Sequence, residues 1–135
     1  MSHENVEVVL RIHRAVVRGD VDGLLAEVHP AGEYTAAIQQ AIEGADGVFR
    51  GHEGLRRWLG ELHDLYEDFE TEVLEARDVG DQVVVRFVVR GRGRGSGVTL
   101  EQQLAQVVTL EDGKAINVRD YFSAEEALEA VGLVK

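Results

Sequence analysis

The chain has 135 residues, 44% hydrophobic and 29% charged, which is ordinary for one globular domain and excludes a disordered or fibrous protein. Fourteen Lys and Arg against 25 Asp and Glu give a net charge of −11, which disfavours binding to nucleic acid or to anionic membranes. Without Cys there can be no disulfide, thiolate metal site or cysteine nucleophile. With no membrane-spanning run and no signal-peptide pattern, we expect a cytoplasmic protein with a single domain over residues 1–135.

The first half of the chain has the apolar spacing of helices. The predicted helices, in chain order, cover residues 2–18, 20–28 and 52–67. His29-Pro30 closes the second of them, because the residue before a proline disfavours the helical conformation. The pattern is weak between the second and third helices, where it allows a short strand at 33–35 and a helical turn at 36–42.

After the third helix the period changes to two, which indicates strands. The predicted strands cover residues 70–76, 82–90, 98–110 and 114–122 and should form an antiparallel meander. Ser123 and Glu126 fit a capping box that starts a short last helix. Helices followed by strands predict an α+β fold, in which a curved antiparallel or mixed sheet wraps around the N-terminal helices and leaves a cone-shaped pocket.

Four short sequence motifs, in this order along the chain, are similar to those of a known superfamily. They are Arg18-Gly19-Asp20 with His29-Pro30, Phe49-Arg50-Gly51-His52-Glu53-Gly54, Asp112-Gly113-Lys114, and the ending from Ala127 to Leu133. With them the chain resembles the nuclear transport factor 2-like, or SnoaL-like, superfamily. That resemblance implies a cystatin-like roll. It leaves the activity open, because the superfamily includes isomerases, polyketide cyclases, dehydratases, an epoxide hydrolase and non-catalytic binding proteins.

Strand alternation predicts that Arg86, Gln106 and Asp120 point into the cone as polar groups in an apolar wall. The other positions expected to bind a ligand are Tyr34, Trp58, Val88, Val118 and Phe122. A carboxylate in such a wall can act as a general base, because desolvation raises its pKa and a nearby cation lowers it. Asp120 is therefore the candidate base and Arg86 the residue that orients it. A structural ion pair between the two is an equally open alternative.

The last strand is similar to that of limonene epoxide hydrolase. The matching residues are Gly113-Lys114 and, four residues later, Arg119-Asp120-Tyr121-Phe122. The resemblance implies that Asp120 activates water and that Arg86 supports it. Val88 stands where that family has its proton-donating Asp, so epoxide opening lacks an acid. Proton abstraction next to a carbonyl needs only a base and an oxyanion donor.

Two hypotheses about function follow. In the first, the pocket binds a small hydrophobic molecule and acts as an isomerase, cyclase or hydrolase without a cofactor. In the second, the chain is a non-catalytic dimeric domain for ligand binding or scaffolding. A homodimer is expected because the strand at 82–90 has a second apolar face, formed by Val83, Val85, Phe87 and Val89. The five His share no i, i+3 or i, i+4 spacing, so no metal site is predicted.

Overall fold

The computed structural model describes residues 2–37 and 47–133. The helices are α1 (Ser2–Arg18), α2 (Val21–Ala26), α4 (Gly51–Leu65) and α5 (Ala124–Ala130). The strands are β1 (Val28–Thr35), β2 (Val48–Arg50), β3 (Tyr66–Val79), β4 (Gln82–Gly93), β5 (Thr99–Glu111) and β6 (Lys114–Tyr121). None of the described helices is long and apolar enough to cross a membrane.

Helix ends are fixed by local chemistry. Gly19, at a φ of 67°, ends α1 in the left-handed conformation that favours glycine. Asp20 caps α2, because its side chain accepts a hydrogen bond from the backbone N–H of Gly23. Ser123 caps α5 in the same way and accepts from the N–H of Glu126, which confirms the N-cap of the predicted capping box.

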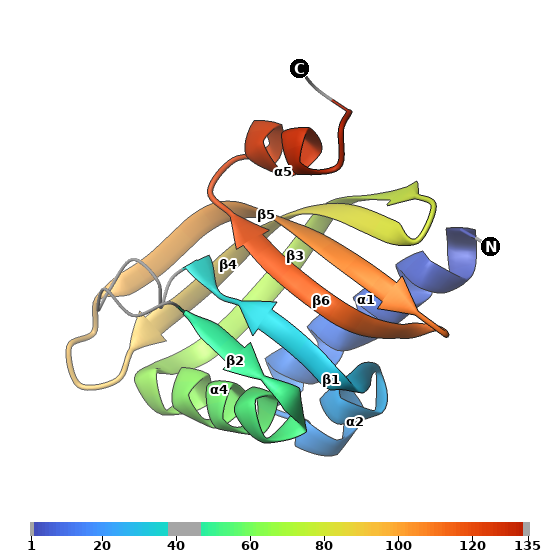
Figure 1. Ribbon diagram of the computed structural model, residues 1–135. Helices are drawn as coiled ribbons and strands as arrows, with labels where there is room; N and C mark the ends of the chain where they lie inside the picture. The colour runs from blue at the N-terminus through green and yellow to red at the C-terminus, as the bar shows by residue number, and fades with distance from the viewer. Residues whose placement is uncertain (1, 38–46, 134–135) are drawn as a thin grey trace.

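The six strands form one curved sheet in the order β2-β1-β6-β5-β4-β3 (Figure 1). Strands β3 to β6 are the predicted antiparallel meander. Strand β1 returns from the N-terminal half and pairs with β6 in parallel, so the sheet is mixed and its two edges, β2 and β3, stay apart. This architecture confirms the predicted α+β class.

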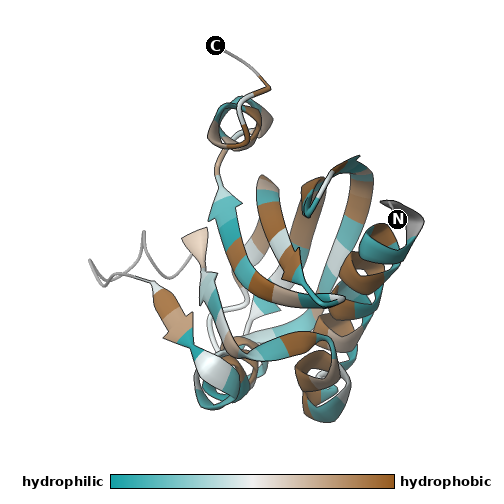
Figure 2. Cartoon of the chain, turned by 45° about the vertical axis from the view of Figure 1, so that its right-hand side comes forward, coloured by the Kyte–Doolittle hydropathy of each residue, from teal (hydrophilic) through white to brown (hydrophobic). Residues whose placement is uncertain are grey.

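The two faces of the sheet have different coverings. The main core lies between the sheet and the helices α1, α2 and α4, and its fully buried side chains include Val9, Leu24, Leu59 and Val85. Helix α5 lies on the opposite face, over Val84, Ala105 and Val107. Bands of alternating hydropathy run along the strands, as expected for a sheet whose faces differ in burial (Figure 2).

Two local predictions, the end of the second helix and the strand at 33–35, were inaccurate. Helix α2 ends at Ala26, before His29-Pro30, and the short strand predicted at 33–35 is the end of the eight-residue β1. Pro30 is tolerated in β1 because the register with β6 is irregular between Val28 and Glu33. Strand β2 was not predicted, and most of the helical turn predicted at 36–42 lies outside the described residues.

The apolar residues on which the homodimer was predicted do not form an outer face. Val83, Val85, Phe87 and Val89 are all at most 4% exposed and belong to the core beneath the helices. The dimer was predicted because these residues were expected to need burial by a partner, and the core of the same chain already buries them. The homodimer itself stays a prediction, which sedimentation at micromolar concentration would test.

Gly54 of α4 packs closely against the backbone of β2. A Cβ built on it would lie 2.9 Å from the carbonyl carbon of Phe49 and 3.3 Å from its Cα, both backbone atoms. We therefore expect Gly54→Ala to lower the free energy of unfolding by about 1–3 kcal/mol, the cost of overpacking. Gly60, in the same helix, has no atom within 4 Å of such a Cβ, so Gly60→Ala should stabilise by about 0.5–1 kcal/mol through helix propensity. Urea unfolding of both variants measures the difference, and equal effects would contradict it.

Candidate functional site

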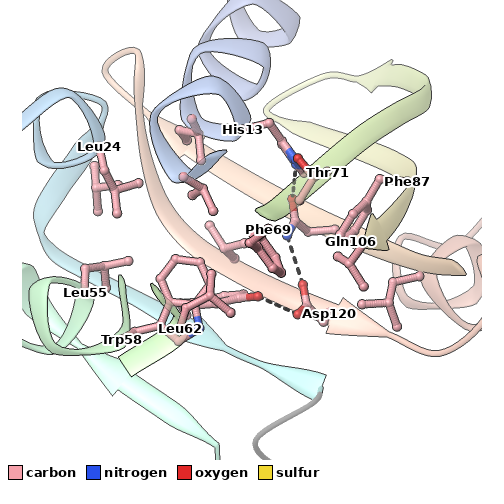
Figure 3. A pocket seen from close by; sticks show the side chains of 17 residues that line it. His13, Leu24, Leu55, Trp58, Leu62, Phe69, Thr71, Phe87, Gln106 and Asp120 are labelled. Carbon is pink, nitrogen blue, oxygen red and sulfur yellow. Dashed lines mark hydrogen bonds between the residues drawn. The ribbon is translucent and has the colours of Figure 1, made fainter. Parts of the chain in front are cut away.

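A cavity of about 60 Å³ lies between the inner face of the sheet and the helices. Seventeen residues line it, and they come from α1, α2, α4 and strands β1, β3, β4, β5 and β6 (Figure 3). Most of the lining is aliphatic or aromatic. The polar side chains are His13, Tyr34, Thr71, Gln106 and Asp120, with the indole of Trp58 beside them.

Among the described residues that line the cavity, Asp120 is the only carboxylate, and it is only 7% exposed. Strand β6 places it beside Gln106 of β5, its register partner. Burial raises the pKa of Asp120 from 3.8 to about 6, and hydrogen bonds from Tyr34, Gln106 and the Ala37 N–H limit that rise. The carboxylate is thus ionised at neutral pH with a pKa close to the working pH of a cell, which suits a general base.

Each oxygen of Asp120 accepts a hydrogen bond. The Tyr34 hydroxyl donates to Oδ2 at 2.6 Å, and the Ala37 N–H donates to the same oxygen at 3.3 Å. The Gln106 amide donates to Oδ1 at 2.9 Å. Burial, together with the charge of Asp120, raises the pKa of Tyr34 well above 10, so this phenol remains a donor. Its ring packs edge-on against Trp58, with centroids 4.8 Å apart.

The polar network continues to α1 and β3. His13 Nε2 lies 3.2 Å from Gln106 Oε1, and His13 Nδ1 lies 2.9 Å from the Thr71 hydroxyl. The dashed lines of Figure 3 follow this path from Thr71 through His13 and Gln106 to Asp120. Burial lowers the pKa of His13 from 6.5 to about 4, so the imidazole is neutral at physiological pH. Its ring lies edge-on to Phe87 at a centroid distance of 5.0 Å.

The structure brings five of the eight predicted site residues to the cavity. These are Tyr34, Trp58, Gln106, Val118 and Asp120. That they bind a ligand, or that Asp120 acts on one, stays a prediction.

The predicted orientation of Arg86 is wrong. Its guanidinium Nε donates to Glu75 Oε1 at 3.1 Å, and its side chain is 39% exposed, whereas its neighbours Val85 and Phe87 are buried in the core. Alternation along β4 therefore sends Arg86 to the face away from the cavity. The expected ion pair with Asp120 is absent as well, since Glu75 is the carboxylate that pairs with Arg86 in the described part of the chain.

Val88 and Phe122 also lie away from the cavity. Val88 shares the outer face of β4 with Arg86, and Phe87 and Val89 take the lining positions instead. Phe122 follows the end of β6 and is 50% exposed, because the strand alternation that would direct it inward stops at Tyr121.

Sequence reasoning missed two polar lining residues, Thr71 and His13, and only the position of His13 carried a signal. His13 lies four residues after Val9 and three before Val16, so it occupies the apolar stripe of α1. A polar side chain on the buried stripe of an amphipathic helix is the signal that could have identified it, because such a group needs a hydrogen-bond partner inside the core. Its partners, Thr71 and Gln106, are 58 and 93 residues away in sequence, and no local pattern gives that contact.

No cluster of three or more His, Asp or Glu side chains suited to a metal ion is present in residues 2–37 and 47–133.

Comparison with known proteins supports the fold. A protein suggested to be a SnoaL-like polyketide cyclase from Jannaschia sp. CCS1 superposes with a TM-score of 0.75 at 23% identity, covering 96% of this chain and 90% of that one. A cystatin-fold protein from Novosphingobium aromaticivorans gives 0.74 at 23%, covering 89% and 97%. TerC, co-crystallised with polyporic acid, gives 0.77 at 25%, covering 93% and 96%.

These structures confirm the predicted nuclear transport factor 2-like, cystatin-like fold. Among curated proteins no relative matches the sequence. The profile of the SnoaL-like domain matches residues 9–118, which is most of the chain. The protein therefore belongs to the SnoaL-like domain family.

Proposed function

We propose that this protein transfers protons at carbon atoms next to a carbonyl group in small apolar molecules, as a cofactor-independent isomerase or cyclase, with Asp120 as the general base. The observation that carries this proposal is a buried carboxylate in the wall of an otherwise apolar cavity. No Arg or Lys lines that cavity in the described parts of the chain. Asp120 is thus held ionised by neutral donors alone, which leaves it basic.

The reaction balances with one base. Asp120 removes a proton from the carbon, and the electron pair of the C–H bond moves into an enolate. In an isomerase the protonated Asp120 returns the proton to a different carbon. In a cyclase the enolate carbon forms a bond to a second carbonyl carbon of the same molecule, and the new alkoxide receives the proton. A pKa near 6 lets Asp120 serve as base and then as acid at neutral pH.

The similar proteins support this class of substrate. The Jannaschia protein is a proposed polyketide cyclase, and TerC was crystallised with polyporic acid. Membership of the SnoaL-like family is consistent with both. Epoxide hydrolysis has less support. Of the residues that the resemblance to limonene epoxide hydrolase singles out, only Asp120 lies at the cavity, and no second carboxylic acid is present among the described lining residues.

A non-catalytic ligand-binding domain is the second candidate. The observation in its favour is that both oxygens of Asp120 already accept hydrogen bonds, as they would in a structural buried carboxylate. In that case the cavity would bind an apolar molecule without changing it.

Deuterium exchange into 2-tetralone separates the two candidates. This apolar ketone has acidic hydrogens next to its carbonyl, so a general base in the cavity should accelerate their exchange in D₂O above the buffer rate. Loss of the proton NMR signal measures the rate, and chemical-shift changes at the cavity residues report binding. Binding without acceleration would favour the non-catalytic candidate and count against Asp120 as a base for this class of ketone.

A further inference from the structure

The two carboxylate oxygens of Asp120 have partners of different kinds. Oδ2 accepts from the Tyr34 hydroxyl, which can rotate about its C–O bond and can accept as well as donate. Oδ1 accepts from the amide of Gln106, which is part of a longer chain of hydrogen bonds. The side chains that continue this chain, His13 and Thr71, come from α1 and β3.

The ionised Asp120 carboxylate, at one end of this chain, fixes the direction of every hydrogen bond in it. An ionised carboxylate only accepts, so the Gln106 amide nitrogen faces Oδ1 and its carbonyl faces His13. A carbonyl only accepts, so His13 Nε2 must carry the proton. A neutral imidazole has one N–H, so His13 Nδ1 is an acceptor and the Thr71 hydroxyl donates to it.

Reversing this chain is far costlier than reversing the bond to Tyr34. If Oδ1 carried a proton, it could keep its hydrogen bond to Gln106 only if the Gln106 amide flipped. His13 would then have to change tautomer, and the Thr71 hydroxyl would have to rotate. For Oδ2 to carry a proton, only the Tyr34 hydroxyl has to rotate, because the Ala37 N–H, 3.3 Å from Oδ2, can go on donating to a lone pair of that oxygen. His13 is 8% exposed and Gln106 6%, so a hydrogen bond lost in the first case leaves a nearly buried polar group without a protein partner.

We propose that Thr71, His13 and Gln106 form a one-way hydrogen-bond relay that reserves Oδ1 of Asp120 as an acceptor, so that Oδ2 carries the transferred proton. His13 and Gln106 are then positioning residues for Asp120. This inference rests on the proposed function only in taking the proton on Oδ2 to come from a substrate carbon. The relay itself is a property of the protein without substrate. Of the described side chains that line the cavity, His13 and Tyr34 are the only titratable groups besides Asp120.

The assignment gives Tyr34 a second role. When Oδ2 takes a proton from the substrate carbon, its new O–H donates to the Tyr34 oxygen, and the Tyr34 hydrogen no longer points at Asp120. That hydrogen is then available to donate to the enolate oxygen at the moment negative charge develops there. Tyr34 keeps its own proton throughout, so the only proton transferred is the one that moves from carbon to Oδ2.

Nitrogen-15 NMR of the His side chains tests the relay in the wild-type protein without any substrate. We expect His13 to show a protonated Nε2 and an unprotonated Nδ1 at every pH from 5 to 8, throughout the titration of the Asp120 carboxyl carbon followed by ¹³C NMR. His52 and His63 are internal references, because Nε2 of each lies 2.8 Å from a backbone carbonyl and must be protonated. A proton on His13 Nδ1 anywhere in this range would overturn the proposal.

Substitution of His13 adds a second measurement. His13→Phe keeps an aromatic ring beside Phe87 but frees the Gln106 amide to flip, so protonation of Oδ1 becomes possible and the Asp120 midpoint should rise by about one pH unit. His13→Gln, which can still donate to Gln106, should restore it. His63→Phe is the matched control, since His63 donates to the Val16 carbonyl and lies outside the relay.

An unchanged midpoint in His13→Phe would overturn the proposal, as would an equal shift in His63→Phe. These titrations need no turnover. If 2-tetralone exchange fails while His13 behaves as expected, the proposed function is wrong and the relay stands. If exchange depends on Asp120 while His13 carries its proton on Nδ1, the relay is wrong and the proposed function stands.

Discussion

Asp120→Asn is expected to slow the exchange of deuterium into 2-tetralone by about 10²–10⁴-fold, the range that a positioned general base contributes. The amide has nearly the shape of the carboxylate but is not basic, so the cavity and its apolar lining are kept while the proton acceptor is lost. Initial rates at pH 7, measured by proton NMR on wild type and variant at equal concentration, give the ratio.

Arg86→Gln is the matched control for this experiment. The sequence assigned Arg86 to the same site, but its side chain pairs with Glu75 on the other face of the sheet. Its substitution should therefore leave the exchange rate unchanged. If Asp120→Asn exchanges as fast as wild type, Asp120 is not the base. If Arg86→Gln loses activity with its fold intact, the placement of the site is wrong.

The spacing of apolar residues was sufficient to predict the helices and strands that have one buried face. The stripe of apolar residues predicted α1 and α4, and the change to a period of two predicted β3 to β6 and their antiparallel order. The same signal failed in β1 and β2. Strand β1 contains Pro30 and a register irregularity, and β2 has only three residues, too few to show any period.

The face of β4 could not be read from its own sequence. Val83, Val84 and Val85 are all buried, because the main core covers one face while α5 covers Val84 on the other. A strand covered on both sides shows no alternation where both coverings overlap. Because α5 covers Val84, the outer face of β4 is also apolar there, and the sequence of the strand does not show whether Arg86 or Phe87 faces the cavity.

Asp120 and Gln106 were correctly directed inward because β5 and β6 each have a polar residue among alternating apolar ones. Their hydrogen bonds to Tyr34 and His13 connect residues that are 86 and 93 positions apart in sequence. The sheet order, with β1 parallel to β6, creates the contact between Tyr34 and Asp120. That order is a tertiary property, and no residue pattern within β1 reveals it.

Two groups in the cavity wall, Asp120 and His13, should make the free energy of unfolding depend on pH in opposite directions. The pKa of Asp120 is about 6 in the folded protein against 3.8 ordinarily, so between these values the folded state holds a proton that the unfolded state releases. Its contribution is fully present below pH 3.8 and is lost as the pH rises to about 6. The loss is about 3 kcal/mol, from 1.36 kcal/mol per pH unit.

His13 acts in the other direction. Its pKa is about 4 in the folded protein against 6.5 ordinarily, so below pH 6.5 the unfolded state binds a proton that the folded state does not. Stability is therefore lost as the pH falls from 6.5 to about 4, again by about 3 kcal/mol. Between pH 4 and 6 the two contributions have opposite signs. They largely cancel in the free energy of unfolding of the wild type.

Single substitutions should separate the two contributions. In Asp120→Asn only the His13 contribution remains, so its free energy of unfolding should fall relative to wild type by about 3 kcal/mol between pH 6 and pH 4. In His13→Gln the Asp120 contribution remains and the relative change should have the opposite sign. Urea unfolding at pH 4, 5, 6 and 7 measures all three proteins, with Asp64→Asn on the exposed side of α4 as a control for the loss of one negative charge.

The difference between variant and wild type isolates these two groups, because every other ionisable residue is common to the proteins compared and its contribution cancels. Curves for Asp120→Asn and wild type that run parallel would show that Asp120 titrates alike in the folded and unfolded states. That result would remove the raised pKa on which its use as both base and acid depends. Opposite slopes in the two variants would instead show that one buried network holds a carboxylate that resists ionisation beside an imidazole that resists protonation.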